Sequence, residues 1–383
     1  MFDRKKANYP IWLKADRCMP IASEQPLPPE VQQRFQQLRP ARKFSPEDFP
    51  VPRLLVRAPN WVGDAVMSLP VLSGLARLFP QAEITVLAAR RVAPLFQGFP
   101  GVAEVVPYPA GRGKWQVLWG LRGHADLALT LPNSLESALG LWLVGVPLRV
   151  GYAADARRPL LNLAVSGRRS LMGLHTVFYY LGLLQALGGV DAFTPPTLYL
   201  QEPELAAAAQ LLPMAGSNPG PWVGLSPGAA YGPAKRWPPE HFAAVGRELA
   251  REFGARLVLL GGPEEGPVAQ LVKERLGLPV LNLVGKTDLR QALGVLSRLQ
   301  LLITNDSGLM HAAAALKVPL VALFGSTDPA ATGPFTDRAT VLRHPLPCAP
   351  CFQRTCETGY ACLTAISVEE AVAAARPWLT ENL

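Results

Sequence analysis

Leu54-Leu55-Val56 forms a short, continuous apolar run, and the loop Ala58-Pro59-Asn60-Trp61-Val62-Gly63-Asp64-Ala65 begins two residues later. A continuous run of this length is typical of a parallel strand that is buried on both faces. The apolar residues between positions 64 and 79 then recur at helical spacing. Strand, loop and helix in this order predict one unit of an α/β fold with a parallel sheet.

The same alternation fills most of the chain. In the first half, further apolar runs occupy residues 84–87, 126–131 and 146–150, separated by segments of helix length. In the second half, strands are expected at 222–225, 257–260, 280–284, 301–304 and 320–324, and helices at 239–252, 264–276, 288–299 and 307–316. Strands that alternate with helices predict two Rossmann-like, doubly wound domains.

Changes of composition suggest the domain boundaries. Residues 1–50 are rich in proline and charge and are interpreted as an N-terminal extension outside the core fold. Residues 51–200 are assigned to the first domain, and residues 201–220, at the end of a Pro- and Gly-rich stretch, to a linker. Residues 221–383 form the second domain, which ends in a cysteine cluster and a final helix.

Length and composition exclude several classes of protein. A chain of 383 residues suits two domains of roughly 100 to 200 residues each. Hydrophobic residues make up 49% and charged residues 17%, which differs from the composition of disordered chains. The net charge of +8 suits acidic partners such as phosphates, nucleic acid or an anionic membrane face.

The sequence also bears on location. No stretch approaches the ~20 apolar residues that a membrane-spanning helix needs. The first residues contain no uninterrupted apolar segment of the kind that a signal peptide has. Five cysteines, an odd number, fit a reducing compartment. We therefore expect a cytoplasmic protein.

Ligands of doubly wound sheets bind beyond the carboxyl ends of the strands, where loops meet helix N-termini. In the first such loop, Gly63 permits close approach of the backbone, and Asp64 stands in the first turn of the following helix. Asp64 is either a helix cap, worth about 1 kcal/mol, or a carboxylate that takes a proton from an acceptor hydroxyl. The sequence leaves both interpretations open.

A second loop, residues 226–238, follows the first strand of the second domain. It matches neither the Walker A pattern nor G-x-G-x-x-G, which weakens NTPase and dehydrogenase functions. It begins at Ser226 and contains Lys235-Arg236, whose cations, with free backbone N–H groups, suit a diphosphate. The alternative is an ordinary connector with a solvated basic end.

A third loop places Asp306, Ser307 and Gly308 at a strand end and helix start, where free N–H groups can face a phosphate. His311 follows Ser307 by four residues and falls on the same helix face, although a lone helical histidine is often only a packed residue. A fourth loop contains Gly261-Gly262 followed by Glu264-Glu265, and a carboxylate at this point either accepts from ribose hydroxyls or caps a helix.

Four of the five cysteines, Cys348, Cys351, Cys356 and Cys362, have the spacing C-x2-C-x4-C-x5-C. Clustered thiols can ligate zinc or an iron–sulfur cluster. Only the first pair has a metal-like spacing, and reduced thiols in a loop are the alternative. A structural metal is left open.

Four strings together resemble the ADP-heptose glycosyltransferase family, family 9, and within it the type II lipopolysaccharide heptosyltransferases. They occur in the family's order, and the similarity covers residues 53–343. The strings are Asn60-Trp61-Val62-Gly63-Asp64-Ala65-Val66-Met67-Ser68, Leu131-Pro132-Asn133-Ser134, Gly232-Pro233-Ala234-Lys235-Arg236-Trp237-Pro238 and Thr304-Asn305-Asp306-Ser307-Gly308-Leu309-Met310-His311.

The resemblance implies the glycosyltransferase B fold, in which two Rossmann-like domains face a cleft. It implies transfer of L-glycero-D-manno-heptose from ADP-heptose to the first heptose of the lipopolysaccharide inner core on lipid A. The transfer inverts the anomeric carbon and requires no metal or other cofactor. The first domain then holds the acceptor, and the second holds the donor.

The resemblance also implies residue roles. Asp64 matches the family's base and Lys235 matches the lysine at the donor diphosphate, so these two are the expected catalytic pair. The implied donor-binding residues are Ser226, Lys235, Glu265, Asp306, Ser307, Gly308 and His311. The implied acceptor-side residues are Asn60, Gly63 and Asn133.

A phosphorylated glycolipid acceptor accounts for a basic protein that binds no nucleic acid. We expect peripheral association with the cytoplasmic face of the inner membrane. The contributing basic residues are expected at 90–91, 112–114, 122 and 157–158. The alternatives are a type I or type III heptosyltransferase, or a nucleotide-sugar-binding protein without turnover.

Overall fold

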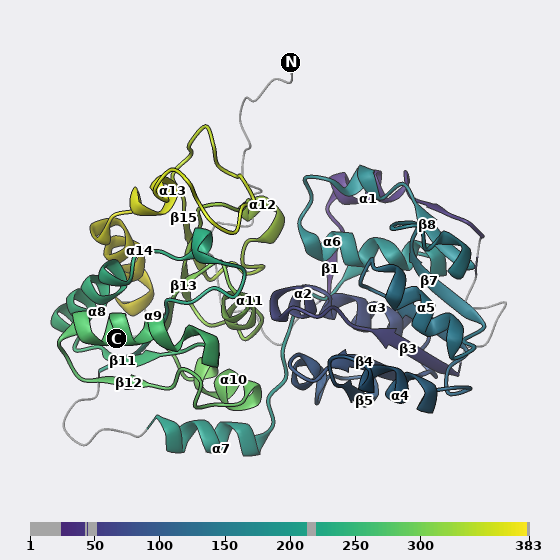
Figure 1. Cartoon of the computed structure of the whole chain (residues 1–383), viewed down its shortest axis with the longest axis horizontal. Coiled ribbons are helices and arrows are strands. Elements are labelled where there is room, and N and C mark those ends of the chain that lie inside the picture. The colour runs from purple at the N-terminus through teal and green to yellow at the C-terminus, as the bar shows by residue number, and fades with distance from the viewer. Residues whose placement is uncertain (1–23, 43, 45–51, 213–219, 381–383) are drawn as a thin grey trace.

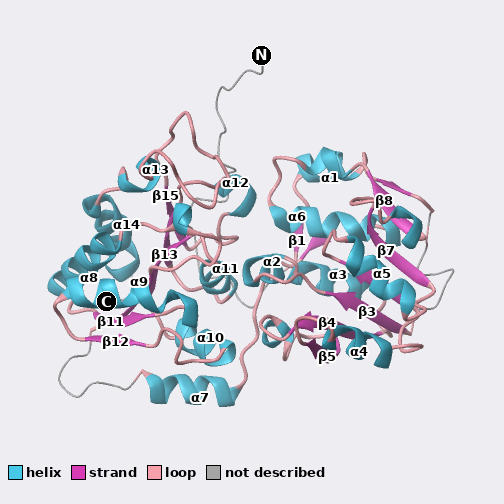
Figure 2. Ribbon diagram, in the orientation of Figure 1, coloured by secondary structure: helices cyan, strands magenta, loops and turns pink. Residues whose placement is uncertain are grey.

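Two α/β domains lie side by side (Figure 1), and helices cover the sheet of each domain (Figure 2). The structure is a computed structural model, and it describes residues 24–42, 44, 52–212 and 220–380. Both sheets consist mainly of short, apolar parallel strands, because a strand that is covered on both faces needs no polar side. The prediction of two doubly wound domains is confirmed.

The N-terminal sheet has the strand order β2-β8-β7-β6-β3-β4-β5. All neighbours are parallel except β2 and β8. The chain order reverses between β3 and β6, which creates the crevice where doubly wound sheets bind ligands. The strands are β2 Arg39–Pro40, β3 Arg53–Arg57, β4 Glu83–Ala89, β5 Val102–Tyr108, β6 Leu127–Thr130, β7 Leu148–Tyr152 and β8 Leu163–Ser166.

The C-terminal sheet is entirely parallel, in the order β12-β11-β10-β13-β14-β15. Its reversal lies between β10 and β13, so the residues after these strands face the same crevice. The strands are β10 Trp222–Ser226, β11 Arg256–Leu259, β12 Val280–Asn282, β13 Leu301–Asn305, β14 Leu320–Leu323 and β15 Ala339–Leu342.

Most helices connect the strands and pack on the sheets. Those of the N-terminal domain are α1 Pro29–Phe35, α2 Val62–Met67, α3 Leu69–Leu78, α4 Gly113–Gly120, α5 Leu135–Leu143 and α6 Thr176–Leu181. Those that follow are α7 Glu202–Leu211, α8 Pro239–Phe253, α9 Gly266–Leu276, α10 Leu289–Ser297, α11 Gly308–Ala315, α12 Pro329–Thr332, α13 Ala361–Thr364 and α14 Val368–Thr380. Among the described helices, none has the length and apolar character needed to cross a bilayer.

One predicted helix, residues 64–79, is two helices. The chain turns between α2 and α3 at Ser68, and Pro70 occupies the first turn of α3. Proline has no backbone N–H and is tolerated in a first turn but not in a helix interior. A new helix therefore starts where the pattern suggested continuation.

The prediction that residues 1–50 lie outside the core is wrong for the part that the structure describes. Strand β1, Gln25–Pro26, pairs with β9, Ala192–Phe193, and β2 pairs with β8. The apolar residues of this segment are buried in the main core; they are Leu27, Val31, Phe35 and Leu38. Val31 and Phe35 lie on the buried face of α1, and Leu27 and Leu38 flank the helix at a spacing of four and three residues, a pattern that the surrounding prolines and charges obscured. Residues 1–23 and 45–50 of the predicted extension lie outside the described residues.

The linker also differs from the prediction of residues 201–220. The chain already contacts the C-terminal domain at Leu198, whose N–H donates to Ala315 O at 3.2 Å. Helix α7 follows directly and packs on α10 with Ala208 buried (Figure 1). The alanine-rich sequence of α7 predicts a linker because nothing local indicates a packing partner. Its partner, α10, lies about 80 residues later in the chain. Residues 213–219 lie outside the described part of the chain.

Candidate active site between the two domains

The helix N-termini of α2 and α11 meet where the two domains touch. A Cβ atom on Gly63 would lie 2.7 Å from His311 Cδ2, and one on Gly308 would lie 2.7 Å from Val62 Cβ. Contacts below 3.0 Å cannot persist, so only glycine at these two positions allows the present approach. The structure thus brings Gly63 of the acceptor-side prediction against His311 and Gly308 of the donor-side prediction.

Asp64 stands in the first turn of α2 and accepts a hydrogen bond at Oδ1 from Tyr180 Oη, at 3.0 Å. Tyr180 belongs to α6 and is only 7% exposed. Burial raises the pKa of Asp64, while the Tyr180 hydrogen bond and the charge of Lys235 lower it. The Asp306 carboxylate raises the same pKa. Asp64 is therefore close enough to Lys235 and Asp306 of the opposite domain for their charges to affect its pKa.

Lys235 approaches this point from the C-terminal domain. Its Nζ lies 2.6 Å from Asp306 Oδ2, and the same oxygen accepts a hydrogen bond from Thr327 Oγ1 at 2.6 Å. Lys235 Nζ also lies 4.9 Å from the centre of the Tyr231 ring, within cation–π range. Asp306 and Tyr231 therefore hold the lysine head group beside the start of α11.

His311 is buried and uncharged. Burial lowers its pKa to about 4, while the Asp306 charge raises it and the charges of His175 and Lys235 lower it. Its ring lies against Gly63, as the geometry above shows. The neutral imidazole thus forms part of the contact between the domains and carries no charge at neutral pH.

The loop that contains Lys235 is fixed by Asn305, the last residue of β13. Asn305 Nδ2 donates to Pro227 O and Gly228 O at 2.8 and 3.2 Å, and Asn305 Oδ1 accepts from Trp237 N at 3.0 Å. The Trp237 side chain is fully buried and donates to Ile366 O at 3.1 Å. Two ends of the loop are therefore anchored, and Lys235 lies between them.

Glu265 lies close to the backbone of the same loop. Its Oε2 accepts from Gly262 N at 2.8 Å, so it caps the short 3-10 turn Pro263–Glu265. A Cβ on Gly228 would lie 2.1 Å from Glu265 Cδ, so a larger residue there would displace the Glu265 carboxylate. Burial raises the pKa of Glu265, while the Gly262 hydrogen bond and the charge of Arg236 lower it.

The two serines predicted to bind the donor lie in different settings. Ser226 is buried as the last residue of β10, in register with Thr304. Ser307 caps α11 by accepting from Met310 N at 3.4 Å, and its Oγ lies 3.3 Å from Thr304 Oγ1. Only Ser307 stands at the helix N-terminus that faces the other domain.

The acceptor-side asparagines anchor two further loops. Asn60 Oδ1 accepts from Tyr108 Oη at 2.6 Å. Asn133 Nδ2 donates to Tyr179 Oη at 2.6 Å, and Asn133 Oδ1 accepts from Arg157 Nη2 at 3.0 Å. Arg157 is fully buried, and that burial lowers its pKa to about 10. It is therefore not one of the surface cations expected at a membrane.

The comparisons with known proteins agree with this architecture. The model of glycosyltransferase family 9 (heptosyltransferase) matches residues 115–361. This chain belongs to glycosyltransferase family 9. It is 36% identical over 307 residues to lipopolysaccharide heptosyltransferase 2 of Salmonella typhimurium, covering 76% of this chain and 88% of that protein.

Two solved structures of the heptosyltransferase family support the same fold. The ADP-heptose LPS heptosyltransferase II of Escherichia coli superposes with a TM-score of 0.71 at 31% identity, over 86% of this chain and 99% of that one. A family 9 glycosyltransferase of Veillonella parvula gives a TM-score of 0.75 at 26% identity, over 86% and 97%. The predicted glycosyltransferase B fold is confirmed.

Three residues of the site were not singled out from the sequence. Tyr180 gave no signal, because residues 176–187 are almost uniformly apolar. Asn305 lay inside a recognised string without an assigned role. Thr327 follows the apolar run 320–324, so its place after a strand could have indicated it.

The cysteine cluster lies in the C-terminal domain of this family 9 chain. Cys348, Cys351, Cys356 and Cys362 are free thiols. Burial raises the pKa of Cys362, and the other three thiols raise it further. Within residues 24–42, 44, 52–212 and 220–380, no three His, Cys, Asp or Glu side chains are arranged to hold a metal.

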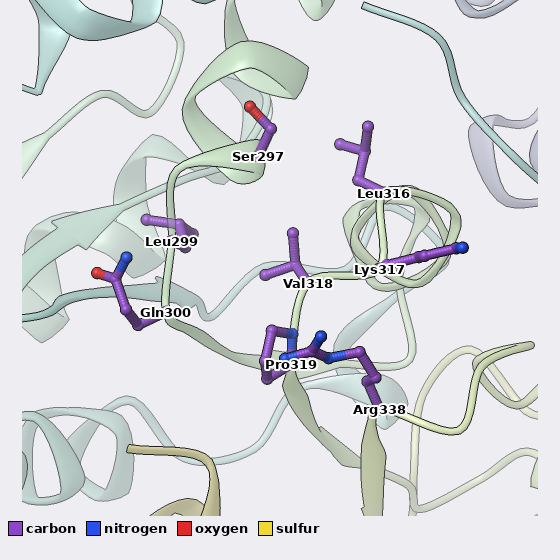
Figure 3. A pocket seen from close by; sticks show the side chains of 8 residues that line it. All are labelled: Ser297, Leu299, Gln300, Leu316, Lys317, Val318, Pro319 and Arg338. Carbon is purple, nitrogen blue, oxygen red and sulfur yellow. The ribbon is translucent and has the colours of Figure 1, made fainter. Parts of the chain in front are cut away.

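A pocket of about 190 Å³ lies at the other end of the C-terminal sheet (Figure 3). Leu299 and Gln300 precede β13, Val318 and Pro319 precede β14, and Arg338 precedes β15. Substrates of this fold bind beyond the carboxyl ends of the strands. The pocket is therefore distinct from the candidate active site.

Proposed function

We propose that this family 9 enzyme transfers L-glycero-D-manno-heptose from ADP-heptose to the first heptose of the lipopolysaccharide inner core. The donor and the acceptor class are those printed in the names of the relatives at 31% and 36% identity. The observation that carries the proposal is the juxtaposition of Asp64 with Tyr180 on one side of the domain junction and of Lys235 with Asp306 on the other.

Asp64 acts as the general base. As the acceptor hydroxyl oxygen bonds to the anomeric carbon, its proton passes to the Asp64 carboxylate. The bond from that carbon to the diphosphate oxygen breaks, and ADP leaves with the electron pair. Attack from the face opposite the leaving group inverts the anomeric carbon, with base and leaving group on opposite sides as in inverting glycosidases.

Lys235 stabilises the departing ADP. Its ammonium group, already held beside Ser307 and the α11 N-terminus, exchanges part of its pairing with Asp306 for the diphosphate. A preorganised donor of this kind is worth roughly 3 to 4 kcal/mol in the transition state. Because a lysine and a helix N-terminus supply this positive charge, we propose that transfer needs no metal. Unchanged turnover after exhaustive chelation checks this.

The remaining donor contacts are assigned by position. Glu265 lies beside the loop 226–238 and accepts from the ribose hydroxyls of the donor. Asp306 and Gly308 orient the diphosphate, and His311 fixes α11 against α2. Ser226, buried in β10, acts through the loop that follows it. On the acceptor side, Asn60, Gly63 and Asn133 shape the wall of the cleft.

The location of the chain follows from its acceptor. A lipid-linked sugar is presented at a membrane surface, so we propose that the protein associates peripherally with the cytoplasmic face of the inner membrane. The net charge of +8 favours an anionic surface.

The deciding experiment measures ADP release from ADP-heptose with defined core glycolipids. Release with an acceptor that ends in the first heptose supports the proposal. Release only with the acceptor that lacks any heptose indicates a type I enzyme, and release only with a longer core indicates a type III enzyme. No release with any acceptor, with ADP-heptose bound, indicates a nucleotide-sugar-binding protein.

A further inference from the structure

Helix α5 carries apolar side chains on its outer face as well as its inner face. Leu141 and Val144 pack into a core cluster beneath it. On the outside, Leu135, Trp142 and Leu143 are 48%, 50% and 41% exposed. Trp142 and Leu143 follow Leu135 by seven and eight residues, which is two turns of an α-helix, so the three side chains lie on the same side of α5. The outer stripe is unpartnered in the described structure, although the helix has a complete core contact.

Helix α4 runs beside α5 in the same direction. Lys114 Nζ lies 2.7 Å from Glu136 Oε2. The Leu118 side chain packs over Gly140, where an added Cβ would lie 3.1 Å from Leu118 Cδ1. Both contacts join residues 22 positions apart, so Trp119 lies level with Leu141 and Trp142 along the pair. Trp119 is 59% exposed. The two exposed tryptophans therefore lie at the same level of the helix pair, and Trp119, Leu135, Trp142 and Leu143 together define the outer face of α4 and α5.

Cations border this face. The Arg122 guanidinium lies 5.0 Å from the centre of a Trp119 ring, and Lys114 Nζ lies 5.5 Å from that of Trp115. Residues 112–124 contain Arg112, Lys114 and Arg122 and no acidic residue. Glu136, the acid on α5, is paired with Lys114. Tryptophan next to arginine or lysine is the composition that settles at the headgroup level of a bilayer.

We propose that the outer face of α4 and α5 docks this protein on an anionic phospholipid bilayer. Trp119, Trp142 and Leu143 enter the headgroup region, and Arg112 and Arg122 pair with lipid phosphates. The cations favour this occupant over a second copy of the chain, which would bring like charges together. The inference deepens the proposed function, since a lipid-linked acceptor brings the enzyme to such a surface.

The position of α5 in the fold agrees with this role. It begins directly after Asn133-Ser134, at the carboxyl end of β6. From Leu135 to Leu143 the stripe extends about 12 Å at 1.5 Å per residue. The docking face therefore starts at the acceptor side of the crevice, where a membrane-anchored sugar enters.

The test is flotation of the full chain with vesicles of phosphatidylethanolamine and phosphatidylglycerol, and with vesicles of phosphatidylcholine. Binding to the anionic vesicles that weakens with salt is expected. Trp142→Ser with Leu143→Ser is expected to lower the partition coefficient about tenfold or more. Arg122→Gln is expected to lower it about fivefold.

Matched controls come from α9 in the other domain. Leu271, which is 40% exposed, and the exposed Lys273 lie on α9, and Leu278, which is 41% exposed, lies two residues after its end. The variants Leu271→Ser with Leu278→Ser, and Lys273→Gln, are expected to bind as the parent protein does. Equal losses in the α9 and α5 variants overturn the proposal, as does equal binding to both vesicle types. A parent dimer that Trp142→Ser dissociates also overturns it.

Activity on a water-soluble acceptor without acyl chains separates the two proposals. The α5 variants are expected to keep the parent turnover there and to lose it only on vesicle-embedded acceptor. A parent protein that binds anionic vesicles but releases no ADP contradicts the proposed function and leaves the docking face supported. A parent protein that transfers heptose but does not bind vesicles contradicts only the proposed docking face.

Discussion

The pKa of Asp64 depends on two neighbours from different elements, Tyr180 and Lys235. The low-polarity junction raises the pKa of its carboxyl, and Tyr180 and Lys235 oppose that effect. The result is a carboxylate that is a stronger base than one in water yet keeps a defined orientation. A solvated aspartate cap would show neither property.

Asp64→Asn keeps an oxygen for Tyr180 to donate to but removes the proton acceptor. We expect the turnover number to fall about 10²- to 10⁴-fold, the usual contribution of a general base. Binding of ADP, measured by calorimetry, and the free energy of unfolding serve as controls and should be unchanged. Turnover close to that of the parent enzyme would show that another group takes the proton.

We expect Tyr180 to position Asp64, and the pH profile of Tyr180→Phe tests this role. The Tyr180 hydrogen bond lowers the pKa of Asp64, so its removal raises that pKa further. Because the base works only when ionised, the acid limb of turnover should move to higher pH. Turnover on the alkaline plateau should fall about tenfold, as expected for a hydrogen bond to a charged group.

The control for Tyr180→Phe is Tyr152→Phe. Tyr152 is also buried and donates a hydrogen bond, but to Tyr179 O at 2.6 Å and not to a carboxylate. Both variants lose one buried hydroxyl. If the acid limb stays in place in both, Tyr180 does not act through Asp64.

At the scale of elements, the contact of α2 with α11 decides how the two half-sites meet. Gly308→Ala places a methyl group 2.7 Å from Val62 Cβ, on the stem of a side chain that has little freedom. We expect a loss of roughly 1 to 3 kcal/mol in the free energy of unfolding, as for overpacking, and a raised KM for the donor. Urea denaturation and steady-state kinetics measure the two effects.

Gly266→Ala is the matched control for the α11 glycine. Both glycines begin a helix, but a Cβ on Gly266 meets no atom within 4 Å. Alanine has the higher helix propensity, so this variant should be as stable as the parent or slightly more so. A Gly308→Ala variant that behaves in the same way would mean that the domains are not in close contact there.

The elements themselves were largely readable from the sequence. Buried strands such as β3 and β13 are continuous apolar runs, whereas β5, at a sheet edge, mixes exposed Glu104 with apolar residues and was missed. The loops after β3, β10 and β13 could be assigned because ligands collect there. Tyr180 and the buried Arg157 could not, since their roles depend on contacts with residues 24 to 116 positions away.

At the scale of the whole molecule, the two domains share one apolar core and several polar contacts. Arg290 of α10 donates to Tyr199 O at 2.9 Å and to Pro94 O at 3.2 Å, and it pairs with Glu204 at 2.8 Å. It therefore ties the N-terminal domain, the crossing segment and α7 together. On the far side of α11, His175 and Thr176 at the start of α6 donate to Gly333 O and Ala331 O, each at 2.9 Å.

His175 makes this junction sensitive to acid. Its Nδ1 accepts from Val177 N at 3.2 Å while Nε2 donates to Gly333 O, so the ring must be neutral to serve both domains. Burial lowers its pKa to about 4, and burial does the same for His311. In the unfolded chain the same histidine has a pKa near 6.5. Between pH 4 and 6.5 the unfolded chain therefore binds more protons than the folded chain. The contribution of the neutral His175 to the free energy of unfolding is therefore fully present above pH 6.5 and is lost as the pH falls towards 4.

His175→Asn should make the protein less sensitive to acid. Asparagine also caps helices, and it does not titrate. A shift from 6.5 to about 4 corresponds to about 3 kcal/mol. Between pH 7 and 4 the free energy of unfolding, from urea titrations, should fall by about that much less in the variant than in the parent. Superimposable pH profiles would mean that His175 is solvated or already charged, and that the junction of α6 with the α12 loop is open in solution.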